Sequence, residues 1–147
     1  MTGEPAKAAF KVRPGRRGDA EGIRHLMTEL SLASDAQTVT WIVSHPEMEL
    51  LVGADALDKV VGVLALSHRP QMHLAGRVMT IDELAVSKAW RRQGVGRELL
   101  KRAVDRAKVL GVKRVEIQTL GIDDEGARTF LAACGFETSS ASVWRLK

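Results

Sequence analysis

The stretch Leu84-Ala-Val-Ser-Lys-Ala-Trp-Arg-Arg-Gln-Gly-Val-Gly96 joins a strand-like run to a helix. The run Thr80 to Val86 is short and rich in apolar residues, which favours a strand. Apolar residues at helical spacing then predict a helix over Val95 to Leu110. Gly94 and Gly96 leave no side chain over the first turn of that helix. The free N–H groups and the positive end of the helix dipole can therefore meet an anion directly.

Three cations, Arg91, Arg92 and Arg97, add to this anion site, so the loop predicts phosphate binding. A Walker loop is excluded because no Gly-Lys-Ser/Thr follows. A dinucleotide fingerprint is excluded because Leu99 stands where the third glycine should be. The remaining structural alternative is a glycine-containing helix start beside a basic surface.

Residues 91–96, Arg-Arg-Gln-Gly-Val-Gly, resemble the Arg/Gln-x-x-Gly-x-Gly/Ala pyrophosphate loop of the GCN5-related N-acetyltransferases (GNAT), which hold coenzyme A. Residues 81–86 resemble the fourth strand of that family, and residues 127–136 resemble its Ala-x-x-Phe-Tyr-x-x-x-Gly-Phe segment. Residues 13–21 resemble the entry into its first helix. The resemblance spans about residues 10–147, and it implies that acetyl-coenzyme A is the cosubstrate.

The resemblance also implies which residues bind the cosubstrate. The pantetheine arm would lie along the fourth strand, where two parallel strands part, and the pyrophosphate would lie on the loop. The implied residues are Leu84, Ala85, Val86, Arg91, Arg92, Gln93, Gly94, Val95, Gly96, Arg97 and Asp124. Asp124 stands where the family often has an asparagine that hydrogen-bonds pantetheine or its water.

The order of predicted elements matches the mixed α/β sheet of this family, βααβββαβαββ, in a single domain. The expected strands are 10–13, 48–54, 59–67, 78–86, 114–120, 136–139 and 142–146, and the expected helices are 20–33, 36–45, 95–110 and 125–134. Asp35 is expected to cap the second helix. A strand-helix-strand unit predicts that the strands at 78–86 and 114–120 are parallel.

Composition limits the remaining classes of protein. The 147 residues suffice for one domain, expected at residues 10–147 after a flexible leader at residues 1–9. Cys134 is the only cysteine, so no intrachain disulfide can form. The first ten residues contain no signal-peptide core, and the longest apolar run, Val60 to Leu66, is too short to span a membrane. These features predict a cytoplasmic protein without a membrane partner.

The net charge of +4 raises the question of nucleic-acid binding. Many of the cations lie within residues 91–114, where the phosphate loop and the exposed face of its helix account for them. Tyrosine is absent and no aromatic residues are interleaved with the basic ones, which argues against a base-stacking surface. His68 and His73 fall near a turn without metal-ligand spacing, so we expect no metal site.

Amide formation needs a deprotonated amine. Freeing the lone pair of an amine of pKa about 10.4 costs about 4.6 kcal/mol at pH 7, so a carboxylate base is useful. Asp82 matches the acidic position of the polyamine acetyltransferases in the family, and Glu83 follows it. Glu116, on the next strand, matches the acidic position of the ribosomal-protein acetyltransferases. Strand alternation predicts that Asp82 and Glu83 point to opposite faces.

The chain departs from the family on the acid side. Leu131 stands where many members carry a tyrosine that protonates the departing thiolate. Cys134 could donate a proton, but a cysteine before Gly-Phe at a helix end more often packs in a core. We therefore expect coenzyme A to leave as a thiolate or to take its proton from water. The missing tyrosine keeps open the alternative of a catalytically silent acyl-coenzyme A-binding module.

The acceptor amine has no readable motif. Few residues follow Phe136, so the closing strands can have little connecting loop. We therefore expect an open acceptor side, completed by a second subunit in a homodimer or by an acceptor with its own surface. Both a small molecule and a polypeptide remain candidate acceptors.

Overall fold

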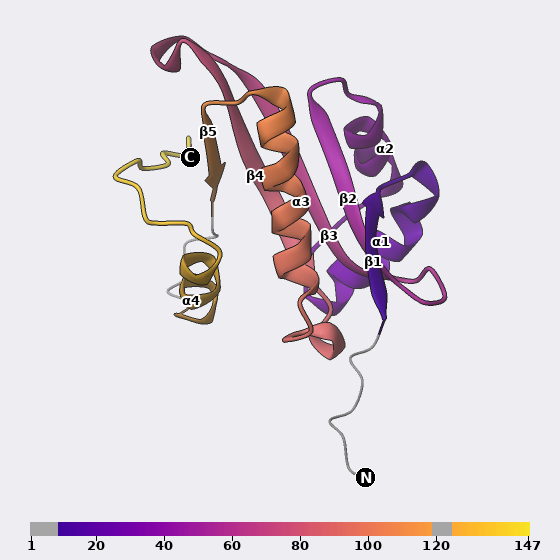
Figure 1. The fold of residues 1–147 in the computed structure, drawn as a ribbon. Coiled ribbons are helices and arrows are strands. Elements are labelled where there is room, and N and C mark those ends of the chain that lie inside the picture. The colour runs from indigo at the N-terminus through magenta and orange to yellow at the C-terminus, as the bar shows by residue number, and fades with distance from the viewer. Residues whose placement is uncertain (1–8, 119–124) are drawn as a thin grey trace.

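In the part of the chain that the structure describes, five strands form one mixed sheet in the order β1-β2-β3-β4-β5 (Figure 1). The computed structural model describes residues 9–118 and 125–147. The strands are β1 (Phe10–Pro14), β2 (Met48–Asp55), β3 (Val60–Gln71), β4 (Gly76–Val86) and β5 (Arg114–Ile117). Neighbouring strands are antiparallel except β4 and β5, which are parallel as the strand-helix-strand pattern predicts.

Helices cover both faces of the sheet (Figure 1). The α-helices are α1 (Ala20–Glu29), α2 (Ala36–Ser44), α3 (Val95–Leu110) and α4 (Glu125–Ala133), and the short 3₁₀ helices are η1 (Arg17–Asp19), η2 (Met72–Leu74) and η3 (Lys88–Trp90). Alternate residues of β3 serve the two faces: Val63 packs with α1 and α2, and Leu64 packs with α3. None of the helices in the described part is both long and apolar enough to cross a membrane.

Helix α3 has the bounds that its periodicity predicts. Its N-cap is Gly94 (φ 88°), and its C-cap is Gly111 (φ 66°), both in the left-handed region that glycine adopts readily. Asp35 caps α2 as expected, because its carboxylate accepts a hydrogen bond from the Thr38 N–H at 2.7 Å. Strand β3 runs four residues further than the expected end at Ser67, so the β3–β4 turn is confined to the segment around η2.

The expected closing strands at 136–139 and 142–146 are wrong. Residues 136–147 are irregular and mostly exposed, and β5 has no outer neighbour among the described residues. The segment is rich in serine, whose side chain competes for backbone donors. The Ser139 hydroxyl accepts a hydrogen bond from the Ala141 N–H at 2.9 Å, which makes a local turn in place of a strand pairing.

Candidate active site

A β-bulge interrupts β4 at Asp82. Leu66 of β3 pairs with Ile81, and Ala65 pairs with Glu83, so Asp82 has no partner on β3. The extra residue resets the alternation of side chains along the strand. Ile81 is fully buried against the α3 side, whereas Glu83 lies opposite Ala65 on the face that α1 and α2 cover.

Asp82 lies on this same face. The Ser67 hydroxyl donates a hydrogen bond to its carboxylate, and Arg69 attracts it. Ser67 and Arg69 share the α1/α2 face with Ala65, since they are two and four residues further along β3. The expectation that Asp82 and Glu83 point to opposite faces is therefore wrong, because the bulge brings both carboxylates to one face.

The environments of these carboxylates differ. Partial burial raises the pKa of Glu83, and the negative charge of Asp82 raises it further. Burial also raises the pKa of Asp82, but the Ser67 hydrogen bond and Arg69 oppose that rise. Within residues 9–118 and 125–147, no cation offsets the rise at Glu83. A raised pKa makes a carboxylate a stronger base, which favours Glu83 for proton abstraction.

A cavity of about 260 Å³ lies beside Glu83. It opens between α1, α2 and the sheet. Its lining residues are Ile23, Met27, Ala33, Ser34, Asp35, Thr38, Val39, Ile42, Leu50, Val63 and Glu83. Of the three carboxylates that the sequence offers as bases, Glu83 is the one that borders this cavity.

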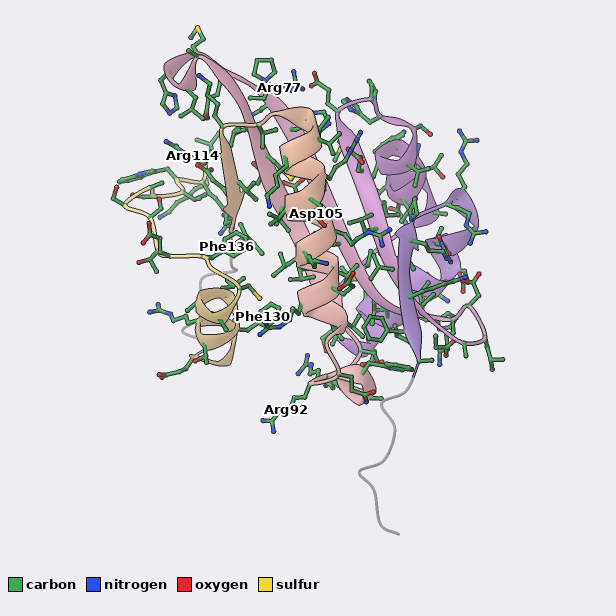
Figure 2. The ribbon with its side chains drawn as sticks, in the orientation of Figure 1. Arg77, Arg92, Asp105, Arg114, Phe130 and Phe136 are labelled. Atoms are coloured by element: carbon green, nitrogen blue, oxygen red, sulfur yellow. The ribbon has the colours of Figure 1, made fainter. Side chains whose placement is uncertain are left out.

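Glu116 lies outside this cavity. It is on the edge strand β5, where its backbone is in register with Thr80. Its side chain is 45% exposed and accepts a hydrogen bond from Arg114 Nη1 at 3.3 Å (Arg114 is labelled in Figure 2). The structure therefore places Glu116 beside Arg114 on the edge strand, outside the cavity.

Strands β4 and β5 part after Ile81. Their pairing ends at Ile81 and Ile117, so in the described part of the chain the outer edge of β4 has no strand partner beyond this point. The Ser87 N–H donates to the Val61 carbonyl at 2.9 Å, on the β3 side. Alternation then turns the peptide groups of Leu84 and Val86 to the outer edge. Their N–H and C=O groups can pair with an extended, amide-bearing ligand.

The loop after β4 has the geometry of an anion site. Arg92 (φ 63°) and Gly94 (φ 88°) both adopt the left-handed conformation. The first bond of α3 runs from the Glu98 N–H to the Gly94 carbonyl at 3.0 Å, which leaves the preceding N–H groups without an intrahelical acceptor. A Cβ at Gly94 would meet none of the described residues within 4 Å. Arg92 projects from the loop, away from the sheet (Figure 2).

Gly96 has a second role that the sequence did not reveal. A Cβ at this position would lie 3.3 Å from Cζ of Phe130 and 3.6 Å from Cγ2 of Val86. Phe130 extends from α4 toward α3 (Figure 2). The absence of a side chain at Gly96 thus lets α4 pack against the start of α3, at the end of β4.

Glu29 also holds the loop, through contacts that the sequence did not predict. Its carboxylate accepts hydrogen bonds from the Ser87 hydroxyl at 3.0 Å and the Lys88 N–H at 2.8 Å. These bonds tie the last turn of α1 to the beginning of the loop. An acidic residue at a helix C-terminus opposes the helix dipole, and this mismatch was the available signal.

If the loop binds coenzyme A, as the family resemblance implies, replacing Glu29 by alanine is expected to weaken that binding without abolishing it. The loss of the anchor leaves the start of the loop free to move, so we expect the dissociation constant to rise by about twofold to tenfold, the range of a single hydrogen bond. Calorimetry would measure this change. Replacing the exposed Glu21 of α1, which pairs with Arg24, is the control and should leave the affinity unchanged.

The remaining residues of interest have packing roles or lie outside the described residues. Leu131 and Cys134 are partly buried against the α3 side of the core. Trp90 packs edge-to-face with Phe10 at a ring-centroid distance of 6.4 Å. Asp124 lies outside the described residues. In residues 9–118 and 125–147, no group of three His, Cys, Asp or Glu side chains is arranged to hold a metal ion.

Comparison with known proteins assigns a family. Residues 21–136 match the model of the acetyltransferase (GNAT) family. A search of curated protein sequences finds no significant match.

Solved structures share the fold at low identity. A transcriptional regulator from Bacillus halodurans C-125 matches 95% of this chain and 100% of its own, with 21% identity and a TM-score of 0.84. A ribosomal-protein-alanine N-acetyltransferase from Brucella melitensis biovar Abortus 2308 matches 94% and 100%, with 15% identity and a TM-score of 0.75. An aminoglycoside acetyltransferase from an uncultured soil metagenomic sample, solved with sisomicin, matches 94% and 97%, with 20% identity and a TM-score of 0.75.

Proposed function

Because the chain belongs to the acetyltransferase (GNAT) family, we propose that it transfers an acetyl group from acetyl-coenzyme A to a primary amine, with Glu83 as the base. Family membership, and the acetyltransferases among the similar solved structures, support this activity. The observation that carries the proposal is the position of Glu83. This residue is on β4, the strand that leads into the proposed phosphate loop, and it borders the cavity.

The cosubstrate would be held by two segments. The pyrophosphate would accept hydrogen bonds from the N–H groups of residues 93–96, with Arg91, Arg92 and Arg97 adding positive charge. The pantetheine arm would pair with the outer edge of residues 84–86, where β4 and β5 have parted. The open space at Gly94 and the parted strand edge both support this placement.

The reaction would be a direct attack on the thioester. Glu83 takes a proton from the ammonium group, and the freed nitrogen forms the new C–N bond with the acetyl carbonyl carbon. The C–S bond then breaks and coenzyme A leaves as a thiolate, whose pKa of about 8.5 makes it a competent leaving group. The nitrogen gives up its second proton to water, which leaves the neutral amide. Asp82 and Glu116 remain second and third candidates for the base.

The thiolate takes its proton from water in this scheme. Leu131 supplies no proton, and Cys134 packs against the core on the α3 side. The acidic residues Glu83 and Asp82 lie on the opposite face. A protein-derived general acid is therefore not part of the proposal.

Replacing Asp82 by asparagine is expected to shift the acidic limb of the pH–rate profile to lower pH. Asp82 raises the pKa of Glu83, so its neutralisation lowers that pKa. Glu83 then stays deprotonated, and active as a base, at more acidic pH. The pH dependence of kcat measures this shift. A limb that moves to higher pH, or stays in place, would contradict the coupling of the two carboxylates.

A thiol-release assay with a broad amine panel tests the proposed function. Amine-dependent release of coenzyme A supports an acetyltransferase. Tight binding of coenzyme A without turnover of any amine would instead support the alternative, an acyl-coenzyme A-binding module. Our expectations of a cytoplasmic location and of a homodimer remain predictions.

A further inference from the structure

The cavity beside Glu83 has an apolar floor. The side chains that form the floor are at most 7% exposed, and they come from α1, α2, β2 and β3. They are Ile23, Met27, Val39, Leu50 and Val63. Binding of a ligand that covers this floor becomes more favourable in proportion to the apolar surface that the ligand buries there.

The rim of the cavity is acidic. Asp35 and Glu83 are its two charged residues, and among the described residues that line it none carries a positive charge. The Thr38 backbone N–H donates a hydrogen bond to Asp35 and holds the pKa of that carboxyl below its usual value. Asp35 is therefore ionised near neutral pH. An ammonium group is attracted to this rim, and a ligand carboxylate is repelled by it.

We propose that the acceptor is a small primary amine with a compact apolar body and no carboxylate. The amine nitrogen lies at Glu83 and the apolar body lies over Val39, Leu50 and Val63. The proposal rests on the proposed function, because it takes the cavity to be the acceptor site of that reaction. The proposal predicts that apolar amines are better acceptors than free amino acids, which can carry the same apolar group but add a negatively charged carboxylate.

A series of straight-chain amines, from methylamine to hexylamine, tests the apolar floor. Each added methylene is expected to raise kcat/KM by roughly fourfold until the chain outgrows the cavity. Calorimetry of the same amines, with the coenzyme A complex of the protein, gives a second readout that needs no turnover. A flat dependence of both quantities on chain length would overturn the proposal.

A matched pair tests the acidic rim. Leucine and 3-methylbutylamine share one apolar body, and only leucine carries a carboxylate. Leucinamide is a third compound, which has an uncharged carboxamide in place of that carboxylate. We expect 3-methylbutylamine and leucinamide to exceed leucine in kcat/KM by about tenfold or more, as one screened charge repulsion suggests. Equal use of leucine and 3-methylbutylamine would contradict the inference.

Two variants assign this discrimination to Asp35. Replacing Asp35 by asparagine removes the charge and keeps a capping side chain for α2. The ratio of kcat/KM for 3-methylbutylamine to kcat/KM for leucine should therefore decrease. Replacing Asp55 by asparagine is the control, because this carboxylate holds the β2–β3 turn and does not line the cavity. An unchanged preference in the Asp35 variant would contradict the role of this rim.

The two proposals fail in different ways. Turnover of amines without dependence on chain length or charge would overturn the acceptor assignment and leave the acetyltransferase intact. Length-dependent binding of amines without any acetyl transfer would overturn the proposed function and leave the cavity assignment intact.

Discussion

Replacing Gly94 by aspartate is expected to abolish coenzyme A binding while the fold survives. The substitution puts a negative charge at the start of α3, where the pyrophosphate would lie. Repulsion between unit charges about 4 Å apart near a protein surface is about 4 kcal/mol, which corresponds to about a thousandfold loss of affinity. Calorimetry measures the affinity, and thermal unfolding checks the fold.

Replacing Gly94 by asparagine is the matched control. Asparagine and aspartate have the same shape and both tolerate the left-handed conformation that Gly94 adopts. The difference between the two variants therefore isolates the charge. We expect the asparagine variant to retain most of the affinity. If the aspartate variant bound coenzyme A as tightly as the asparagine variant, the proposal that this loop binds the pyrophosphate would be wrong.

Replacing Glu83 by glutamine is expected to lower kcat at pH 7 by about a hundredfold or more, the usual contribution of a general base. The loss should shrink as the pH rises toward the pKa of the amine, because the amine then deprotonates without help. Steady-state kinetics over a range of pH, with a fixed acceptor, provides the measurement.

Replacing Glu116 by glutamine makes the same chemical change outside the cavity. This variant should keep nearly all of the activity if Glu83 is the base. The reverse result, a large loss of activity in the Glu116 variant and none in the Glu83 variant, would identify Glu116 of β5 as the base. An unchanged pH profile in all three carboxamide variants, at Asp82, Glu83 and Glu116, would argue against any side-chain base.

Local sequence signals predicted helix α3 and the glycine-containing loop before it. The bounds of α3 follow from apolar periodicity and from two glycines that end its regular hydrogen bonding. Such features depend on residues close together in the chain. The hairpin of β2 and β3 and the cap at Asp35 were predictable for the same reason.

Features that depend on distant residues were not predictable. The bulge at Asp82 is a property of the β3–β4 register, so simple alternation along β4 wrongly assigned Asp82 and Glu83 to opposite faces. The Glu29 anchor joins residues 58 and 59 positions apart. The cavity combines side chains from two helices and three strands, and no single segment shows it.

The central claim is that an acetyl group moves from acetyl-coenzyme A to an acceptor amine, with Glu83 as the base that deprotonates this amine. Simultaneous quantification of coenzyme A and N-acetylamine by mass spectrometry tests it most directly, with 3-methylbutylamine as the acceptor. The account predicts that the two products form in equal amounts, that neither forms without the amine, and that both fall together in the Glu83→Gln variant. Release of coenzyme A without acetylated amine, or equal product formation by the variant at pH 7, would contradict it.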